Sequence, residues 1–306
     1  MHEQITDTVL MIRPVNFGFN AETAASNAFQ TDSHVGDSQS QALERFDAFV
    51  KILRAREVNV IIVEDTKDPF TPDSIFPNNW FSTHHSGKVI LYPMEAKNRR
   101  SERRKDIIDN LSKSYHVAQT INLSHFESQE KYLEGTGSLI LDRINKIAYA
   151  CISSRTNLEV LKAWSEQMNY KICSFYSFDT EKKPVYHTNV MMCLGDTFAV
   201  ICLDSILDLD EKLKVKRKLE NSGKRIIEIS LDQMNAFAGN MLLIKNTRNQ
   251  KLLVMSETAF KSLSDKQIEV LDQYANILHV ELGVIETLGG GSARCMLAEI
   301  HLPARN

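Results

Sequence analysis

The chain has 306 residues, of which 43% are hydrophobic and 25% charged, so it can bury a full core and has the composition of a folded protein. Its formal net charge of -3 argues against a dedicated nucleic-acid binder, and no apolar run approaches the length that spans a membrane. The N-terminal segment has no signal-peptide pattern and the five cysteines include no C-x-x-C pair, which predicts a cytoplasmic protein with reduced thiols.

Helical periodicity and short β runs alternate along the chain in five similar units. Each unit has an amphipathic helix, an apolar strand, a turn, and then a second apolar run. The expected helices are 38–57, 98–114, 157–167, 206–223 and 256–277, and the strands after them start at 58, 116, 170, 225 and 278. The second runs open at 76, 134, 187, 237 and 293.

Equivalent positions of the second runs recur at a nearly constant distance. Such a recurrence, here roughly 50 to 60 residues, is the signature of a repeat architecture. The positions are Asn79, Gly137, Asn189, Asn240 and Cys295. We expect a closed ring of five modules in a single domain, 1–306, with the N-terminal run 8–14 pairing with the last module so that no sheet edge stays exposed. An ordinary open α/β sheet is the alternative.

A ring of this kind brings the N-terminal ends of its inner strands together near the axis. Cysteine, histidine and an acid then meet from distant parts of the chain, as nucleophilic catalysis requires: a thiolate attacks, an imidazole moves protons and a carboxylate holds the imidazole. Each residue alone also fits a structural role, and only their convergence favours a site. The glycines of LGGGS (288–292) would let a planar substrate carbon reach the sulfur. The residues at these ends are Asn78, Asn79, Glu134, His187, Asn189, Asn240 and Cys295.

Four segments resemble a known superfamily. LGGGSARCM (288–296) resembles the cysteine loop of arginine deiminase, and the stretch 133–157 resembles the hairpin and the S-x-R-T-N segment of arginine deiminase and dimethylarginine dimethylaminohydrolase. PDSIFPNNW (72–80) is similar to the segment whose acids hold the substrate guanidinium, and HTN (187–189) stands where these enzymes have His-x-Asp. The resemblance implies the pentein fold, an α/β five-fold ββαβ propeller. RPVNFGFN and FPNNWFSTH are most similar to citrulline-utilisation hydrolases.

The resemblance also implies roles for single residues. Cys295 would be the nucleophile and His187 the general acid and base, and Glu134 would orient His187 or hold a substrate nitrogen. Arg155 matches the family arginine that holds the substrate α-carboxylate, a task suited to a bidentate guanidinium. The substrate-binding candidates are Asp73, Asn78, Asn79, Asn189, Arg155 and Arg100, the last with Arg99, Arg103 and Arg104 as alternatives in the run 98–105.

Three positions depart from the guanidino-group enzymes. Asn78, Asn79 and Asn189 stand where those enzymes have acids. A carboxylate neutralises a buried guanidinium, whereas an amide offers a donor and an acceptor to a neutral ureido group. We therefore expect a hydrolase that converts citrulline to ornithine, carbon dioxide and ammonia through an S-carbamoyl intermediate. Because related arginine dihydrolases also use Asn near the site, an arginine deiminase, dihydrolase or amidinotransferase with an S-amidino intermediate is the alternative.

We expect no metal and no cofactor. His84 and His85 are neighbours in an expected strand, so their side chains point to opposite faces and cannot chelate one ion. The expected partner is a small amino-acid substrate, and neither nucleic acid nor a membrane. The oligomeric state stays open, with a homo-oligomer as one option. A ring-shaped binding scaffold without activity is the alternative of a different class.

Overall fold

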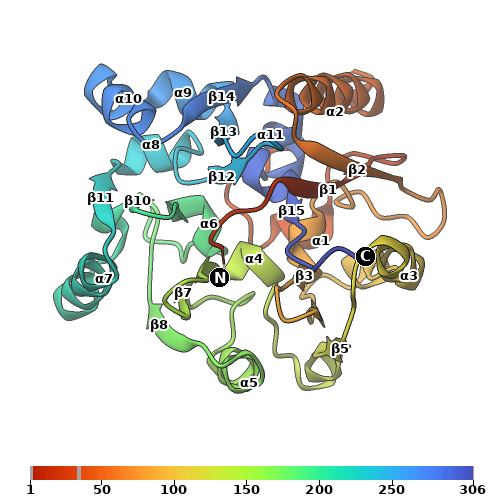
Figure 1. Ribbon diagram of the computed structural model, residues 1–306, viewed down its shortest axis with the longest axis horizontal. Helices are drawn as coiled ribbons and strands as arrows, with labels where there is room; N and C mark the ends of the chain where they lie inside the picture. The colour runs from red at the N-terminus through yellow and green to blue at the C-terminus, as the bar shows by residue number, and fades with distance from the viewer. Residues whose placement is uncertain (1–2, 33–35, 306) are drawn as a thin grey trace.

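Five small sheets surround a central axis in the computed structural model, which describes residues 3–32 and 36–305 (Figure 1). Each sheet has three strands, and its middle strand pairs antiparallel with one neighbour and parallel with the other. The sheets are β15 (Ala298–Glu299), β1 (Thr8–Arg13) and β2 (Asn59–Glu64); β3 (Phe81–Thr83), β4 (Lys88–Leu91) and β5 (Gln119–Asn122); β6 (Ile140–Asp142), β7 (Ile147–Cys151) and β8 (Lys171–Phe175); β9 (Met192–Leu194), β10 (Phe198–Ile201) and β11 (Arg225–Glu228); β12 (Leu242–Lys245), β13 (Lys251–Ser256) and β14 (Asn276–Val280).

Helices on the outside connect the parallel strands of each sheet (Figure 1), since a parallel pair needs a crossover connection. These helices are α2 (Ser38–Ala55), α3 (Lys105–Ser114), α5 (Leu158–Met168), α7 (Leu209–Asn221), and the pair α9 (Glu257–Ser262) and α10 (Asp265–Asp272). The short helices are α1 (Ala21–Ala24), α4 (Gly135–Ser138), α6 (Thr188–Met191), α8 (Leu231–Asn235) and α11 (Gly283–Gly289), and the 3₁₀ turns are η1 (Pro77–Asn79), η2 (Asn98–Glu102), η3 (Ser124–Gln129), η4 (Leu203–Ser205) and η5 (Ala293–Met296).

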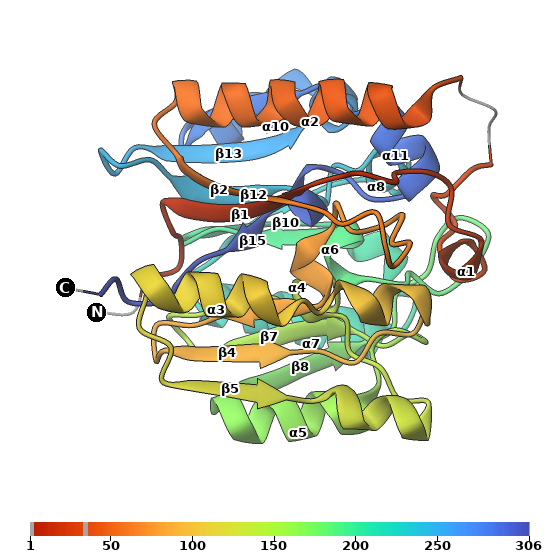
Figure 2. The same ribbon diagram turned by 90° about the vertical axis from the view of Figure 1, so that its right-hand side faces the viewer.

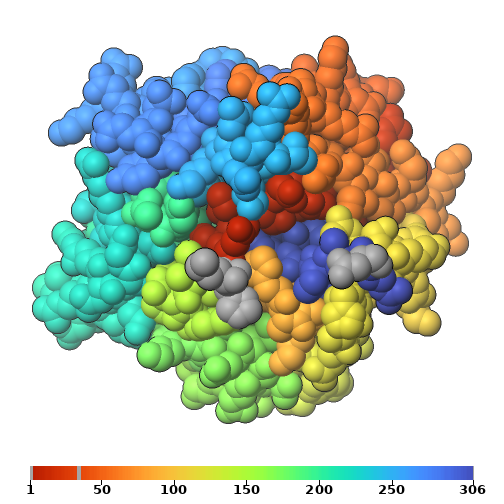
Figure 3. Space-filling model, viewed as in Figure 1, coloured from red at the N-terminus to blue at the C-terminus, as the bar shows by residue number. Residues whose placement is uncertain are grey.

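The N-terminal strand closes the ring. Val9 pairs with Glu299 of β15 in antiparallel register, and β1 also runs parallel to β2 over its whole length. The predicted closure and the pentein five-fold ββαβ propeller are therefore confirmed, and the open-sheet alternative is wrong. Seen from the side, the two termini lie at one end of the molecule and α1 at the other (Figure 2). On the face with the termini, segments close to both chain ends cover the centre of the ring (Figure 3).

Two of the expected helices are interrupted. The expected helix 98–114 is a 3₁₀ turn, η2, followed by α3, because the backbone of Arg103 leaves the helical region. The expected helix 256–277 ends at Ser262 and restarts after Ser264, whose side chain forms a capping box with Gln267. The interruption at η2 decides which arginine side chain of this segment turns inward.

Short helical turns precede four of the five inner strands. η1, α4, α6 and η5 stand before β3, β6, β9 and β15, and the equivalent positions of the sequence repeat lie on these turns or, for Asn240, just before β12. Turns from neighbouring modules contact each other, as η1 does with α4 and η5, and α4 with α6. The ring therefore gathers residues from all parts of the chain around its axis.

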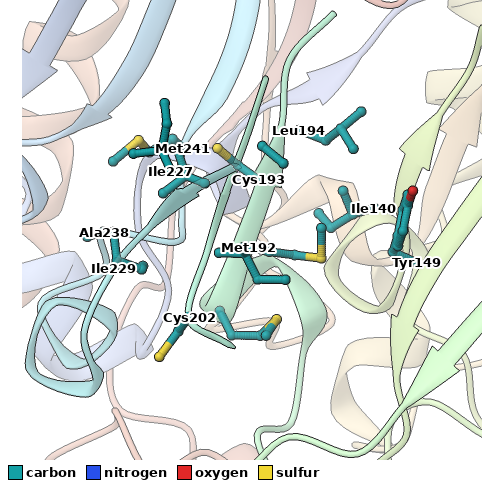
Figure 4. Close-up of a cluster of buried hydrophobic side chains, with 14 of the residues drawn as sticks. Ile140, Tyr149, Met192, Cys193, Leu194, Cys202, Ile227, Ile229, Ala238 and Met241 are labelled. Carbon is teal, nitrogen blue, oxygen red and sulfur yellow. The ribbon is translucent and has the colours of Figure 1, made fainter. Parts of the chain in front are cut away.

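Apolar side chains fill the space between the sheets and the outer helices. Trp164 of α5 is fully buried and its Nε1 donates to the hydroxyl of Tyr92, 3.0 Å away. Figure 4 shows the cluster around β9, where Met192, Cys193 and Met241 lie among aliphatic side chains. Within the described residues, the structure has no helix that is both long and apolar enough to cross a membrane.

Candidate active site

A small pocket is lined in part by Thr23 of α1. The helix α1 lies at the end of the molecule away from the termini (Figure 2). The pocket is lined by residues from the N-terminal segment, the turns near the axis and the glycine loop, which are Thr23, Asn27, Asp73, Phe76, Asn79, Arg99, Arg155, Tyr186, His187, Gly289, Gly290, Gly291 and Cys295. Most of these positions are buried, so a ligand here would be removed from bulk water.

Two carboxamides contact the sulfur of Cys295. The Nδ2 atoms of Asn189 and Asn240 each lie 3.3 Å from Sγ. The orientation of Asn240 is fixed by two backbone groups, because its Oδ1 accepts from the N–H of Arg294 at 3.0 Å and its Nδ2 donates to the carbonyl of Asn189 at 3.0 Å. The amide N–H groups of Asn240 therefore face the carbonyl of Asn189 and the sulfur.

The glycine loop before Cys295 is needed for packing. A Cβ at Gly289 or Gly291 would lie 2.8 Å from the ring of Phe76, and a Cβ at Gly290 would lie 2.3 Å from Nδ2 of Asn27. Gly290 also has a φ of +62°, which favours glycine. The groups that approach this loop are thus Phe76 and Asn27, and together they form one wall of the pocket.

His187 stands between Glu134 and Gly137. Its Nε2 lies 2.9 Å from Oε2 of Glu134. A Cβ at Gly137 would lie 2.8 Å from Nδ1 of His187 and 2.5 Å from Nδ2 of Asn79, so only glycine lets these two polar atoms come so close to the backbone. Nε2 is thus engaged by Glu134, and Nδ1 is the ring nitrogen that lies beside Gly137 and Asn79.

Burial and charge set the protonation of this pair. Burial lowers the pKa of His187 to about 4, although the hydrogen bond that Nε2–H donates to Glu134 opposes the shift. Burial alone would raise the pKa of Glu134, but Arg155 and His187 outweigh it and bring the pKa to about 2. At neutral pH a neutral imidazole therefore donates through Nε2 to an ionised carboxylate and keeps a lone pair on Nδ1.

Charged groups gather on the side of the pocket near α1. Arg155 donates to the hydroxyl of Ser26 and to the carbonyl of Thr23, 2.8 Å away, and its Nη1 lies 3.5 Å from Glu134. Oδ2 of Asp73 accepts from the side chains of Asn20 and Thr23 at 2.7 and 3.0 Å. Oδ1 of Asp73 has no hydrogen-bond partner among the described residues, and burial raises the pKa of this carboxyl despite the nearby Arg99.

The two arginines of η2 point in different directions. Arg99 is buried, lines the pocket and donates from Nη1 to Oδ1 of Asn79 at 2.9 Å. Arg100 lies outside the pocket and donates to the carbonyls of Met94 and Glu95. Of the alternatives in the run 98–105, the structure thus places Arg99 at the pocket and Arg100, the named candidate, elsewhere.

Most of the other expected site residues lie together. Cys295, His187, Asn79, Arg155 and Asp73 line the pocket, while Glu134 contacts His187 and Asn189 contacts the sulfur. Asn78 is fully buried but does not line the pocket, and its backbone carbonyl accepts from Thr136 at 3.3 Å.

Sequence reasoning named Asn240 and Arg99, but it assigned Asn240 no contact with the sulfur and did not select Arg99 among the four arginines. It missed the wall that the segment 20–27 contributes through Thr23 and Asn27. The repeat gave a signal for Asn240, which occupies the position equivalent to Asn79 and Asn189. For the segment 20–27 the sequence carries no comparable pattern.

The remaining cysteines are Cys151, Cys173, Cys193 and Cys202, and they lie in the apolar core. Burial raises the pKa of Cys193 to about 12 and that of Cys173 to about 11. Figure 4 shows Cys193 and Cys202 among aliphatic side chains. Across residues 3–32 and 36–305, no cluster of three or more His, Cys, Asp or Glu side chains is placed to hold a metal ion.

A five-fold propeller with cysteine, histidine and glutamate gathered at its axis defines a pentein of the guanidino-group-modifying class. Comparison of the sequence with protein families gives a match over residues 13–302 to the family described as N,N dimethylarginine dimethylhydrolase, eukaryotic. The chain belongs to this family, whose members are C–N hydrolases of the amidinotransferase and arginine deiminase-like superfamily. No curated protein matches the sequence.

Solved structures share the fold at low sequence identity. The N-terminal domain of ArgZ, a cyanobacterial arginine dihydrolase, was solved covalently bound to a reaction intermediate and has a TM-score of 0.76 at 17% identity, over 97% of this chain and 98% of that one. Against the longer ArgZ chain the match covers 97% of this chain but 41% of ArgZ, so this chain spans about two fifths of that length. DDAH from Pseudomonas aeruginosa, solved as a mutant complexed with citrulline, has a TM-score of 0.66 at 15% identity, over 98% of this chain and 100% of that one.

Proposed function

We propose that the protein is a single-domain, cysteine-dependent hydrolase that cleaves the ureido group of citrulline to give ornithine, carbon dioxide and ammonia. The observation that carries this proposal is the neutral character of the pocket around Cys295. The amides of Asn189 and Asn240 contact the sulfur, and Asn79 lines the same pocket. The carboxylate of Glu134, which contacts His187, is already paired with Arg155.

A guanidinium in this place would lack a counter-charge. Burying a cation without a matched anion costs several kcal/mol, whereas a neutral ureido group needs only hydrogen-bond partners. The far side of the pocket does carry charge, in Asp73 and Arg155. These two groups suit the ammonium and the carboxylate of an α-amino acid. The charges at one end and the amides at the other therefore match a zwitterionic head and a neutral side chain.

The chemistry follows from the placement of the proton carriers. Nδ1 of His187 takes the proton of the Cys295 thiol, and the thiolate attacks the ureido carbon to form a C–S bond. Amide N–H groups, with Asn79 as the candidate, stabilise the oxyanion of the tetrahedral intermediate. When the bond to the side-chain nitrogen breaks, His187 returns its proton to that nitrogen, and ornithine leaves an S-carbamoyl enzyme.

The second half of the reaction uses the same pair. Nδ1 of His187 takes a proton from water, the resulting hydroxide attacks the S-carbamoyl carbon, and the thiolate of Cys295 leaves. The carbamate released then decomposes to carbon dioxide and ammonia. Glu134 holds the imidazole by its Nε2–H and so keeps Nδ1 as the acceptor in both steps.

A second candidate is hydrolysis of arginine through an S-amidino intermediate. It is favoured by the fold shared with ArgZ, which is described as an arginine dihydrolase. The two candidates differ in the group that is left on the sulfur.

The deciding experiment is incubation with citrulline, arginine, agmatine and methylated arginines, followed by amino-acid analysis and mass spectrometry of quenched enzyme. We expect ornithine from citrulline and a carbamoyl adduct on Cys295. Turnover of arginine with an amidino adduct, and none of citrulline, would replace this proposal by the second candidate. A reactive thiol at Cys295 towards iodoacetamide also separates either enzyme from an inactive scaffold, which needs no such thiol.

A further inference from the structure

We propose that Arg99 determines the specificity of the pocket by fixing the carboxamide of Asn79 with its N–H groups, and not its carbonyl, towards the reacting position. This inference rests on the proposed function, since it explains how that pocket distinguishes a ureido group from a guanidinium. Arg99 acts here as a positioning residue through Asn79.

The direction of the Asn79 amide follows from the chemistry of its partner. A guanidinium has only donors, so the atom that faces Nη1 of Arg99 at 2.9 Å must be the oxygen, Oδ1. Turning the amide round would set its N–H groups against those of Arg99. The usual ambiguity of asparagine side chains is thereby removed by the neighbour.

Arg99 is itself held on several sides. Its Nε and Nη2 each donate to the carboxylate of Glu102 at 2.9 Å, and Nη2 also reaches the carbonyls of Asp73 and Phe76 at 3.4 and 3.3 Å. Arg99 is 2% exposed and Glu102 is 4% exposed. A buried bidentate pair with additional backbone contacts leaves Arg99 little conformational freedom. The hydrogen bond from Arg99 therefore also fixes the side chain of Asn79.

The opposite end of the Asn79 amide lacks a partner. Nδ2 is buried and has no hydrogen bond among the described residues, and it lies beside Gly137 on the side that also holds Nδ1 of His187. A buried donor without an acceptor is unfavourable, so a ligand that brings an acceptor gains the free energy that the empty pocket loses. The N–H groups of Asn79 therefore select for an acceptor next to the proton-transferring nitrogen.

A ureido group has this acceptor and a guanidinium does not. The carbonyl oxygen of citrulline, and the oxyanion that forms from it, accept from Asn79. All three nitrogens of a protonated guanidinium are donors, so the same position would set N–H against N–H. A site built for a hydrogen bond rejects the ligand that leaves its groups unpaired.

The test compares substrate preference in variants that release Asn79. Arg99→Gln/Glu102→Gln removes both buried charges together. The carboxamide of Gln at position 99 can donate or accept, so the Asn79 amide is free to turn round. We expect the ratio of kcat/KM for citrulline to that for arginine to fall at least about 10-fold. Arg99→Lys keeps a donor-only neighbour and should keep the ratio within about 3-fold of wild type.

A matched control comes from the same segment. Arg103 and Glu127 form an ion pair at 2.6 Å that lies outside the pocket lining. Arg103→Gln/Glu127→Gln removes an equivalent pair without freeing Asn79, so the ratio should stay at the wild-type value. An unchanged ratio in folded Arg99→Gln/Glu102→Gln, or an equal change in the control pair, would overturn the inference.

A binding measurement separates this inference from the proposed function. Calorimetry on the Cys295→Ala protein gives the affinities for citrulline and arginine without turnover. If wild type does not cleave citrulline, the proposed function is wrong. The inference is then tested by the ratio of the affinities for citrulline and arginine, compared between Cys295→Ala and Cys295→Ala with Arg99→Gln/Glu102→Gln. If that double variant does not fold, an NMR measurement on Cys295→Ala replaces the affinity ratio. The signal observed is the ¹⁵N–¹H signal of the Asn79 side-chain amide, which is assigned by its loss in Asn79→Asp. Citrulline should move this signal downfield, and an equal movement with arginine would contradict the inference.

Discussion

The two ends of the pocket differ in the charge of their polar groups. Around Cys295 the polar groups are the neutral amides of Asn189 and Asn240, whereas near α1 the wall carries the charges of Asp73 and Arg155. At the second end Arg155 contacts Glu134, and Oδ2 of Asp73 accepts two hydrogen bonds. Oδ1 of Asp73 has no partner among the described residues. A ligand with a charged head and a neutral reactive group would match this division.

Similar burial has opposite consequences for the polar groups at the two ends of the pocket. A buried ion is stable only with a partner, and breaking such a pair costs about 3 to 5 kcal/mol. A buried amide needs hydrogen bonds but no counter-ion. Leaving it without a ligand therefore costs less free energy than leaving an ion unpaired.

The largest effect is expected from Cys295→Ala at the neutral end. We expect turnover to fall by about 10⁴-fold or more, because the covalent step has no other nucleophile. Steady-state rates and circular dichroism would check the loss and the retained fold. Cys193→Ala is the matched control, since it removes a thiol from the core and should lower stability by about 1 to 3 kcal/mol with little change in rate. Wild-type activity in Cys295→Ala would refute the covalent mechanism.

At the charged end, Arg155→Lys should lower kcat/KM for citrulline by about 10²-fold, because lysine cannot reproduce a bidentate contact with a carboxylate. The loss should appear mainly in KM. N-carbamoylputrescine, which lacks the carboxylate, is the control substrate and should lose much less. An equal loss for both substrates would mean that Arg155 acts through Glu134 and not on the substrate head.

At the neutral end, Asn79→Asp is expected to change the substrate preference. A carboxylate cannot donate to the ureido oxygen, so the preference for citrulline over arginine should fall by about 10-fold or more. Arginine should bind more tightly even if its turnover stays low. The measurement is kcat/KM and affinity for both substrates. A wild type that prefers arginine, or an unchanged preference in the variant, would contradict the division of the pocket.

The smallest expected effect is the pH dependence of kcat/KM and of the free energy of unfolding, which both depend on His187. Burial lowers the pKa of His187 to about 4, so the imidazole stays a base, and kcat/KM should hold as pH falls from 7 and decline only near 4 to 5. Between the ordinary pKa of 6.5 and about 4 the unfolded chain binds more protons than the folded one, so the free energy of unfolding should fall as pH falls through this window. Rate profiles and chemical denaturation at several pH values would check both statements, and a rate profile that declines near 6.5 would count against a buried, neutral His187.

Much of the architecture could be read from local patterns. The spacing of Asn79, Gly137, Asn189, Asn240 and Cys295 predicts the five modules, because a repeated supersecondary unit leaves a periodic trace in the sequence. The segment 8–14 is apolar and without a hairpin partner, which predicts closure of the ring. The convergence of Cys295 and His187 then follows from the repeat, since equivalent positions of a ring lie around one axis.

Only the tertiary structure decided how these residues face one another. Arg99 and Arg100 are neighbours with the same side chain, and the choice between them depends on the 3₁₀ turn η2 and on Glu102, which pairs with Arg99. The direction of the Asn79 amide depends in turn on Arg99. Residue type states which donors and acceptors exist, but their direction depends on partners that are distant in sequence and are brought together by folding.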